Sequence, residues 1–405
     1  MTEIKESMTT PVWGEYDLIV AGGGVAGCCA AVQARRAGVE RVLLLEKSYV
    51  LGGLATQGLI VLYEPLDDGK GKRITYGMAE ELFRRFAELG PVKIPEAWED
   101  FPDRVPEGSG RCKSFYSEAA SMIALDDFVI ESGAEVLFDS RIVGVETDGN
   151  VLTGVIVEST EGRGVYKTRA AIDATGDATL LDRMGVPCVK GENVISVILK
   201  EGNPDTMKTA LASGNLLDLY GHRVLLSNAS GQGHPGDLPK MAGVTSKEVT
   251  EFMLYERKAA KEHLLSVPYP KQQKDILQLP TMPQLRVIRH IDAAYTPVDA
   301  DINTHIADSV SPVADFLHSG DWLELPYRSL YHPAYPNVWA AGRTAAADGW
   351  AWMVARVIPG VAATGQAAGM AAALCLQQGL DAATLPYETL AEALVAAGVR
   401  LHAED

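Results

Sequence analysis

The sequence predicts an α/β fold, in which helices cover a mainly parallel β-sheet. Two patterns predict it. Near the N-terminus, an apolar strand, a glycine-rich turn, a helix and a second apolar strand follow one another within about thirty residues, the length of a βαβ unit. Much later, an apolar strand and a glycine turn again precede a helix. The sheet is therefore expected to be built from separated segments of the chain.

The first unit begins with a buried strand over residues 16–20, because five mainly apolar residues precede the glycines. A helix over 26–37 follows and ends at Gly38, a favourable C-terminal residue. The next strand covers 41–45. Residues 1–14 are expected to form a mobile tail, and the first ten have no apolar core of a signal peptide.

Later elements are predicted from the periodicity of apolar residues and from turn residues. Helices are expected over 78–89, 117–132, 246–264 and from 359, strands over 135–138, 142–147, 153–158, 169–174 and 338–341, and turns at 148–150 and 161–162. Segments 1–62, 115–185 and 332–385 would form a discontinuous nucleotide-binding domain, 63–114 and 186–331 a second α+β substrate or cap domain, and 386–405 a C-terminal helix and tail.

Charge and composition exclude several classes of function. The net charge of −17 disfavours nucleic acid or an anionic membrane as a partner. Five cysteines without a CxxC motif favour a reducing compartment, so we expect a cytoplasmic protein. Residues 357–380 carry no charge, but they are rich in Ala, Gly and Gln, which favours a buried helix over a membrane span. No metal-binding spacing is present, so no metal site is expected.

The glycines of the first turn match the G-x-G-x-x-G pattern. Gly22 permits a tight turn, Gly24 lets the backbone approach a pyrophosphate, and Gly27 lets the helix pack on the strand. The helix N-terminus then offers free N–H groups to phosphates. Residues 231–236 match the same pattern, but Pro235 prevents a helix there, so we interpret them as a loop.

Glu46 ends the second strand at about the spacing from the glycines, some 20 residues, at which an acidic side chain binds an adenosine ribose. The alternative is a solvated carboxylate beside Lys47. Ribose binding would also disfavour NADP, whose 2′-phosphate would be repelled. These features fit NAD and FAD equally.

Three further segments favour FAD. Residues 52–56 (GGLAT) follow Glu46 closely and could run along a second stretch of cofactor. Residues 172–177 (IDATGD) end a later strand, and residues 338–343 (VWAAGR) lead to Asp348 and a small-residue helix. With these segments the chain resembles the FAD-dependent oxidoreductase family of the glutathione-reductase structural type, in the group of fumarate reductase flavoproteins and the flavin subunit of heterodisulfide reductase.

The resemblance covers residues 16–62, 115–185 and 283–376 and is most specific over 356–369. It implies that the glycine turn and the segment after 173 hold the pyrophosphate, that Ile142 meets adenine through its backbone, and that the N-terminus of the last long helix faces the flavin pyrimidine. The implied cofactor-binding residues are Gly22, Gly24, Val25, Ala26, Gly27, Glu46, Lys47, Gly53, Leu54, Ala55, Thr56, Ile142, Ala174, Thr175, Gly176, Gly342, Arg343, Asp348, Arg356, Gly360, Val361 and Ala362.

The chain departs from its relatives at one position. They often carry Ser or Thr followed by His where this chain has Asp348 and Gly349. No histidine precedes His222, so a histidyl link near the glycine turn has no attachment residue. We therefore expect non-covalent FAD.

The candidates for substrate chemistry are Arg286, Arg289 and His290, which cluster on one segment, and Tyr327. A guanidinium beside the flavin could hold a carboxylate, although a strand with a solvated basic face explains the cluster equally well. The expected function is FAD-dependent oxidation or reduction of a small molecule. Alternatives are a flavin electron-transfer subunit of a partner protein and an NAD-dependent Rossmann dehydrogenase. The electron donor or acceptor and a homo-oligomer stay open.

Overall fold

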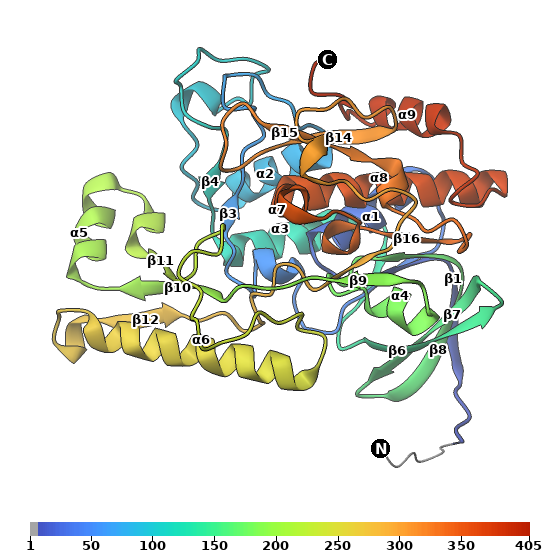
Figure 1. The fold of residues 1–405 in the computed structure, drawn as a ribbon, viewed down its shortest axis with the longest axis horizontal. Coiled ribbons are helices and arrows are strands. Elements are labelled where there is room, and N and C mark those ends of the chain that lie inside the picture. The colour runs from blue at the N-terminus through green and yellow to red at the C-terminus, as the bar shows by residue number, and fades with distance from the viewer. Residues whose placement is uncertain (1–6) are drawn as a thin grey trace.

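A seven-stranded sheet forms the centre of the computed structural model, which describes residues 7–405 (Figure 1). Its strand order is β5-β2-β1-β8-β7-β6, and β16 also pairs with β8. The strands β5, β2, β1, β8 and β16 run parallel, whereas β6 and β7 extend the sheet as antiparallel neighbours. Their bounds are β1 Val12–Ala21, β2 Val42–Leu45, β5 Glu135–Leu137, β6 Arg141–Asp148, β7 Val151–Ser159, β8 Gly162–Asp173 and β16 Val338–Ala340.

The last four residues of β1 are buried on both faces of the sheet, as is usual for a parallel strand at its centre. Leu18 and Val20 point into the core that contains the helices α1 and α8. Ile19 and Ala21 point into a second core on the opposite face. Neighbouring side chains point to opposite faces, and both faces are covered here, so consecutive residues are all apolar. A short apolar run was therefore sufficient to predict the strand.

The helices α1 (Val25–Arg36) and α8 (Ile358–Gln378) pack closely against each other on one face of the sheet. A Cβ on Gly365 would lie 2.2 Å from the Ala26 carbonyl oxygen, and one on Gly369 would lie 2.4 Å from that of Ala30. Glycine is therefore required at both contacts. Among the described residues, α8 alone is long and apolar enough to cross a bilayer, and 89% of its apolar window is buried inside the protein. The predicted buried helix is confirmed.

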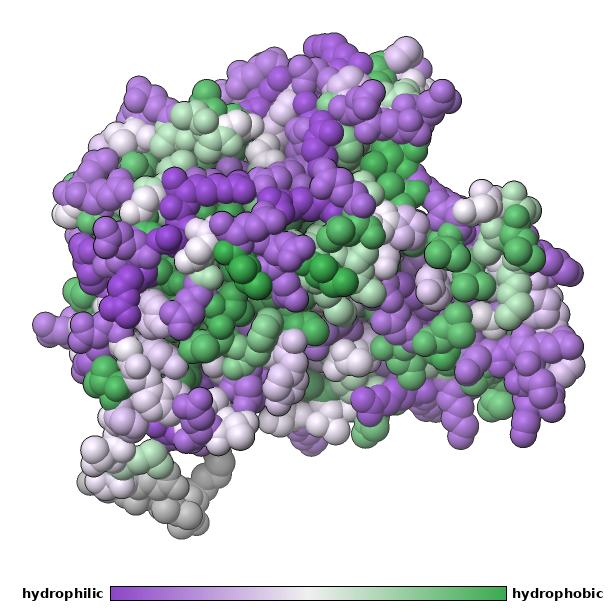
Figure 2. Space-filling view, turned by 180° about the vertical axis from the view of Figure 1, so that it is seen from behind, coloured by the Kyte–Doolittle hydropathy of each residue, from purple (hydrophilic) through white to green (hydrophobic). Residues whose placement is uncertain are grey.

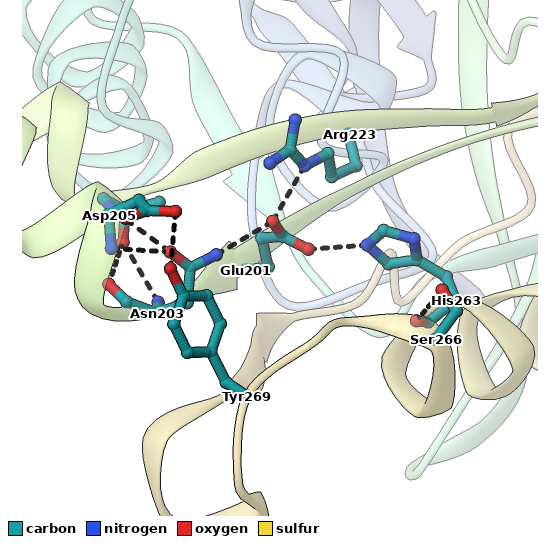
Figure 3. A network of polar contacts seen from close by, with 8 residues as sticks. Glu201, Asn203, Asp205, Arg223, His263, Ser266 and Tyr269 are labelled. Atoms are coloured by element: carbon teal, nitrogen blue, oxygen red, sulfur yellow. Dashed lines mark hydrogen bonds and ion pairs between the residues drawn. The ribbon is translucent and has the colours of Figure 1, made fainter.

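A second, three-stranded antiparallel sheet lies to the left in Figure 1, with α5 and α6 beside it. It consists of β11 (Gly221–Leu226), β10 (Ser196–Gly202) and β12 (Asp275–Gln278), and its helices are α5 (Pro204–Ser213) and α6 (Ser246–Ser266). The buried Glu201 on β10 connects them, because it accepts hydrogen bonds from Arg223 on β11 (2.8 Å) and pairs with His263 on α6 (2.5 Å) (Figure 3).

The remaining elements connect these two parts. The strands are β3 Leu62–Tyr63, β4 Ser114–Phe115, β9 Cys188–Lys190, β13 Arg289–Ile291, β14 Ser309–Ala314 and β15 Trp322–Pro326. The α-helices are α2 Met78–Leu89, α3 Glu118–Glu131, α4 Thr179–Met184, α7 Gly349–Ala355 and α9 Tyr387–Ala396. The short 3-10 helices are η1 Gly53–Ala55, η2 Glu96–Trp98, η3 Leu216–Leu219, η4 Lys271–Gln273, η5 Asp299–Asp301, η6 Tyr327–Ser329 and η7 Gly342–Thr344.

Most predicted elements agree with the structure to within a few residues, and two differ. The tail predicted over 1–14 falls partly outside the described residues, and its last part is wrong, because β1 already begins at Val12. Val12 pairs with Val165, and Trp13 packs edge-on against Tyr166 with 5.8 Å between ring centroids. The strand predicted over 169–174 is only the end of β8, whose first half pairs with β7 as a hairpin. Residues 231–236 form turns, as expected.

Exposed apolar side chains are frequent on the second sheet and its helices. Seen from behind, this part lies on the right, where green patches are visible (Figure 2). The exposed large apolar residues there are Met207, Leu211, Leu216, Val224, Leu254, Leu265 and Leu277. Contiguous apolar patches on a surface often take part in association.

Candidate functional site

A cavity of about 580 Å³ lies between the central sheet and the segments of the second part around 243–250 and 282–288. It opens at the carboxyl ends of β1, β2, β8 and β16, which meet at one edge because these strands are parallel. Ligands of open α/β sheets bind at this edge. The topology thus brings together four loops that are far apart in the sequence.

The glycine turn after β1 forms one wall of the cavity. Gly22 has a positive φ of 96°, and its N–H donates to the Leu45 carbonyl at 2.7 Å. A Cβ on Gly27 would lie 1.8 Å from the Gly22 carbonyl oxygen, so any larger residue would push α1 away from the turn. A Cβ on Gly24 would meet nothing within 4 Å. Gly24 therefore presents bare backbone to open space in the cavity.

Two helix N-termini open into this cavity. α1 follows Gly24 and α8 follows Val357, and neither helix has a side-chain cap or an acidic residue in its first turn. Val25 and Ala26 of α1 and Ile358 and Val361 of α8 line the cavity. Free N–H groups and the helix dipole favour negative charge at such ends. The cavity therefore offers two separate positions for anionic or electron-rich groups.

Glu46, at the end of β2, braces the glycine turn from the cavity side. Its Oε2 accepts a hydrogen bond from the Gly23 N–H at 2.7 Å, and its Oε1 accepts one from the Ser48 N–H at 2.7 Å. The neighbouring Lys47 forms an ion pair with Asp177 at 3.6 Å. These contacts fix the Glu46 carboxylate at the wall of the cavity.

Asp173 fixes the turn that follows β8. This fully buried carboxylate accepts hydrogen bonds from the Thr175 N–H (2.9 Å), the Thr175 hydroxyl (2.7 Å) and the Leu181 N–H (3.0 Å). Burial raises the pKa of Asp173 to about 6. Gly176 has a positive φ of 75°, and a Cβ there would lie 2.2 Å from the Arg343 guanidinium. Arg343 therefore packs directly on the bare backbone of this turn.

Four guanidinium groups lie in or beside the cavity. Arg141 lines it at the start of β6 and is exposed. Arg343 and Arg356 line it, and Arg286 lies close enough to lower the pKa of both. Burial and this mutual repulsion lower the pKa of Arg343 to about 10 and that of Arg356 to about 9. Burial also lowers the pKa of Arg286 to about 10. Such a group of cations is suited to an anionic ligand that compensates their charge.

The structure brings most of the predicted cofactor-binding residues to one cavity. Those that line it are Gly22, Gly24, Val25, Ala26, Glu46, Lys47, Gly53, Leu54, Ala55, Ala174, Thr175, Gly176, Gly342, Arg343, Arg356 and Val361. Gly27, Thr56, Ile142, Asp348, Gly360 and Ala362 are not among the lining residues. Asp348 is exposed and instead caps α7, because its carboxylate accepts the Gly349 N–H at 2.8 Å.

The two arginines predicted for catalysis make contacts to the protein itself. Arg286 donates to the Gln284 carbonyl at 2.7 Å and lies outside the cavity lining. Arg289 forms an ion pair with Asp182 and donates to the Asp177 carbonyl at 2.8 Å. Arg289 therefore connects β13 to α4.

The other two catalytic candidates are packed in the interior. His290 is buried, its Nδ1 lies 2.7 Å from the Ile291 carbonyl oxygen, and its ring meets Trp352 edge-on at 4.8 Å. The Tyr327 hydroxyl donates to the Ala382 carbonyl at 2.8 Å. Neither residue lines the cavity.

Glu64, which the sequence did not single out, lines the cavity just after β3. It is buried, and its Oε2 accepts a hydrogen bond of 3.4 Å from the Ile358 N–H at the start of α8. Burial raises the pKa of Glu64 to about 7. No motif surrounds this residue, so only the tertiary structure reveals its position.

Known proteins resemble this chain in sequence and in fold. The sequence model of the family described as FAD dependent oxidoreductase matches residues 17–212 and 221–394. The p-nitrophenol 4-monooxygenase from Pseudomonas putida DLL-E4 is similar in structure, with 12% identity, a TM-score of 0.50, and coverage of 95% of this chain and 88% of that one. A search of curated proteins by sequence found no match.

Two further solved structures are more distant. The anhydrotetracycline hydroxylase from Streptomyces rimosus has 14% identity and a TM-score of 0.45 over 94% of this chain and 65% of that one. A geranylgeranyl bacteriochlorophyll reductase-like protein from Thermoplasma acidophilum has 13% identity and a TM-score of 0.44 over 95% and 96%. At these identities, structural similarity concerns the fold alone.

Proposed function

This chain belongs to the FAD dependent oxidoreductase family, and from that premise we propose that it oxidises or reduces a small molecule with FAD bound in the cavity at the edge of the central sheet. The observation that carries the proposal is that two helix N-termini, neither of them capped by its own N-cap side chain, meet three arginines in that cavity. We further propose a glutathione-reductase-type FAD domain with the discontinuous boundaries given above, and a second domain that covers the substrate.

The donors around the cavity fit the parts of FAD. We assign the pyrophosphate to the α1 N-terminus at Gly24 and Val25, with Arg343 beside it, because bare backbone and positive charge coincide there. Glu46 would accept the hydroxyls of the adenosine ribose. The α8 N-terminus at Val361 would face the pyrimidine part of the flavin. When bound, FAD supplies the capacity to accept or donate a hydride.

The chain's own residues would support that chemistry in two ways. The dipole of α8 stabilises negative charge that develops at its N-terminus, and it needs no rearrangement to do so. Ile60, Met282 and Leu285 give the cavity apolar walls, which exclude water and strengthen electrostatic interactions inside. Among the residues that the structure describes, no histidine or cysteine lines the cavity, which supports non-covalent FAD.

The two alternatives from the sequence are less well supported. The family match concerns FAD, so it does not favour an NAD-dependent dehydrogenase. It also does not single out an electron-transfer subunit. The five cysteines are free, which is compatible with the cytoplasmic location that we propose. A homo-oligomer through the exposed apolar residues around Leu211 is a further proposal.

The experiment that tests the function starts from purified protein saturated with FAD and passed over a desalting column. We expect one flavin per chain, with absorption bands shifted from those of free FAD. Anaerobic addition of candidate substrates should then bleach or restore these bands without a partner protein. A protein that retains FAD but changes its flavin only with a chemical reductant would favour the electron-transfer alternative. A protein that retains no FAD would contradict the proposal.

A further inference from the structure

We propose that the end of the cavity between Arg356 and Glu64 binds the carboxylate of a small organic acid, with Arg356 as its anion-binding residue and Glu64 as the group that exchanges a proton with the substrate. This inference rests on the proposed function, because it names the substrate class of the same cavity. It starts from the contacts of these two side chains.

Arg356 has no strong acceptor for its guanidinium. Within the part of the chain that the structure describes, its side-chain contacts are to the Met353 sulfur, 3.4 Å from Nε and 3.3 Å from Nη2. A thioether is a weak acceptor, whereas a guanidinium carries five N–H donors. Burial, and the repulsion of Arg286 and Arg343, lower the pKa of Arg356 to about 9, because they disfavour its charged form. An anion in the cavity would accept hydrogen bonds from the guanidinium of Arg356 and compensate its charge.

Of the other cations that line the cavity, Arg141 is exposed at the start of β6, and two have partners. Lys47 pairs with Asp177, and Arg343 donates to the Leu285 carbonyl while it packs on the turn after β8. We have assigned that region to the FAD pyrophosphate. Arg356 lies two residues before α8, at the end assigned to the flavin. Arg356 is therefore the cation at the α8 end of the cavity that remains available to a substrate.

Glu64 lies close enough to Arg356 for each charge to affect the pKa of the other, although the ion pairs of the described residues do not include this pair. Its Oε2 is held by the Ile358 N–H, and its Oε1 has no hydrogen-bond partner in the described part. Both side chains line the cavity, so a ligand at this end would lie against both. With its pKa raised by burial to about 7, Glu64 can take or give a proton near neutral pH.

The charged and titratable groups that face Glu64 come from several elements. Arg356 and Lys113 lower its pKa, and Arg286 responds to its charge. Tyr63 and Tyr116 lie near it as neutral phenols, because burial raises the pKa of each well above the ordinary value. Glu64 is therefore the group of this set that titrates near neutrality.

A carboxylate fits this end better than a phosphate. The planar guanidinium can hold a carboxylate with two parallel hydrogen bonds. A phosphate dianion would be repelled more strongly by an ionised Glu64 than a carboxylate monoanion would. In an oxidation, the substrate C–H bond would give its hydrogen and electron pair to FAD as a hydride, while the proton of the adjacent O–H or N–H passes to Glu64. The reverse transfers describe a reduction.

The test uses FAD-loaded protein and acetate or benzoate as the probe, with the flavin difference spectrum as the readout. We expect saturable binding that weakens as the pH rises through about 7, because ionised Glu64 repels the probe. Arg356→Gln should weaken binding about 10- to 100-fold, the loss typical of a charge-assisted hydrogen bond. Arg356→Lys should bind the probe less tightly than the wild type and more tightly than Arg356→Gln. Glu64→Gln should remove the pH dependence. Arg183→Gln, at an exposed arginine, is the matched control and should change nothing.

Two results would overturn the inference. One is unchanged acetate affinity in Arg356→Gln, and the other is a pH dependence that persists in Glu64→Gln. The flavin content of each variant is measured first, and if Arg356→Gln does not retain FAD, Arg356→Lys provides the affinity comparison. A flavin potential that shifts in Arg356→Gln without any change in acetate affinity would assign Arg356 to the flavin and contradict the substrate role. Loss of FAD binding in the unmodified protein would instead contradict the proposed function.

Discussion

Alanine at position 24 should separate the binding of FAD from the stability of the fold. Gly24 has φ −66° and ψ 174°, which alanine adopts without strain. A Cβ there meets no atom within 4 Å in the protein, so Gly24→Ala should change the free energy of unfolding of the apoprotein by less than about 1 kcal/mol. Any change should be a gain, because alanine restricts the unfolded chain.

The substitution should instead weaken the binding of FAD. The added methyl group would project into the space that we assign to the pyrophosphate and would lengthen or break a hydrogen bond to the N–H groups of α1. A hydrogen bond to a charged group contributes about 1.5–3 kcal/mol, so FAD should bind about 10- to 150-fold more weakly.

Gly27→Ala is the contrasting variant on the same helix. Its Cβ would lie 1.8 Å from the Gly22 carbonyl oxygen and 3.4 Å from the Ala174 side chain, so α1 and the turn must separate. We expect a loss of about 1–3 kcal/mol in the apoprotein, as for other overpacked sites, together with weaker FAD binding. Urea unfolding of the apoproteins and FAD titration by fluorescence quenching measure both quantities. If Gly24→Ala binds FAD as tightly as the wild type does, the pyrophosphate does not lie at the N-terminus of α1.

Three carboxylates give further predictions. Glu256 is buried and has no hydrogen-bond partner among the described residues, and burial raises its pKa to about 8. The free energy of unfolding should therefore fall by up to about 4 kcal/mol as the pH rises from about 4 to 8. Glu256→Gln should remove this slope, measured by urea unfolding at pH 5 and 8. Burial raises the pKa of Glu201, but hydrogen bonds from His263 and Arg223 outweigh this effect and hold the pKa below its ordinary value. The wild type should therefore lose stability in acid, where Glu201 becomes protonated. Glu201→Ala should cost about 3 kcal/mol at neutral pH and show a smaller acid loss. Glu324→Ala removes the acceptor of two backbone N–H groups, at residues 306 and 403, and should speed hydrogen exchange at the C-terminus and cost about 2–4 kcal/mol.

Local chemistry explains what the sequence could predict. The glycine turn, α1 and Glu46 form one continuous βαβ unit, in which each role depends on neighbours within a few residues. The α8 helix was predicted from its small residues, and the contacts of Gly365 and Gly369 with α1 give the reason for them. Residues of this kind carry their structural requirement in the sequence itself.

Long-range placement explains what the sequence could not predict. Glu64 contacts the start of α8, which lies almost three hundred residues later in the sequence, and no local pattern predicts that contact. The basic residues after position 285 could be recognised in the sequence, but the groups that they contact could not. In the structure, Arg289 forms an ion pair with Asp182 on α4. Asp348 follows Gly342 and Arg343 in the sequence, as does the residue of the family pattern. Its side chain caps the N-terminus of α7, however, because that helix begins at the next residue.

The most direct test of the account is a crystal structure of the FAD-loaded protein. We expect the pyrophosphate oxygens within hydrogen-bonding distance of the backbone N–H groups at the start of α1, and the pyrimidine edge of the flavin against the N-terminus of α8. The space between Arg356 and Glu64 should remain beside the flavin ring, open to a carboxylate. FAD bound elsewhere, or in this cavity with its adenine at the α8 end, would contradict the account.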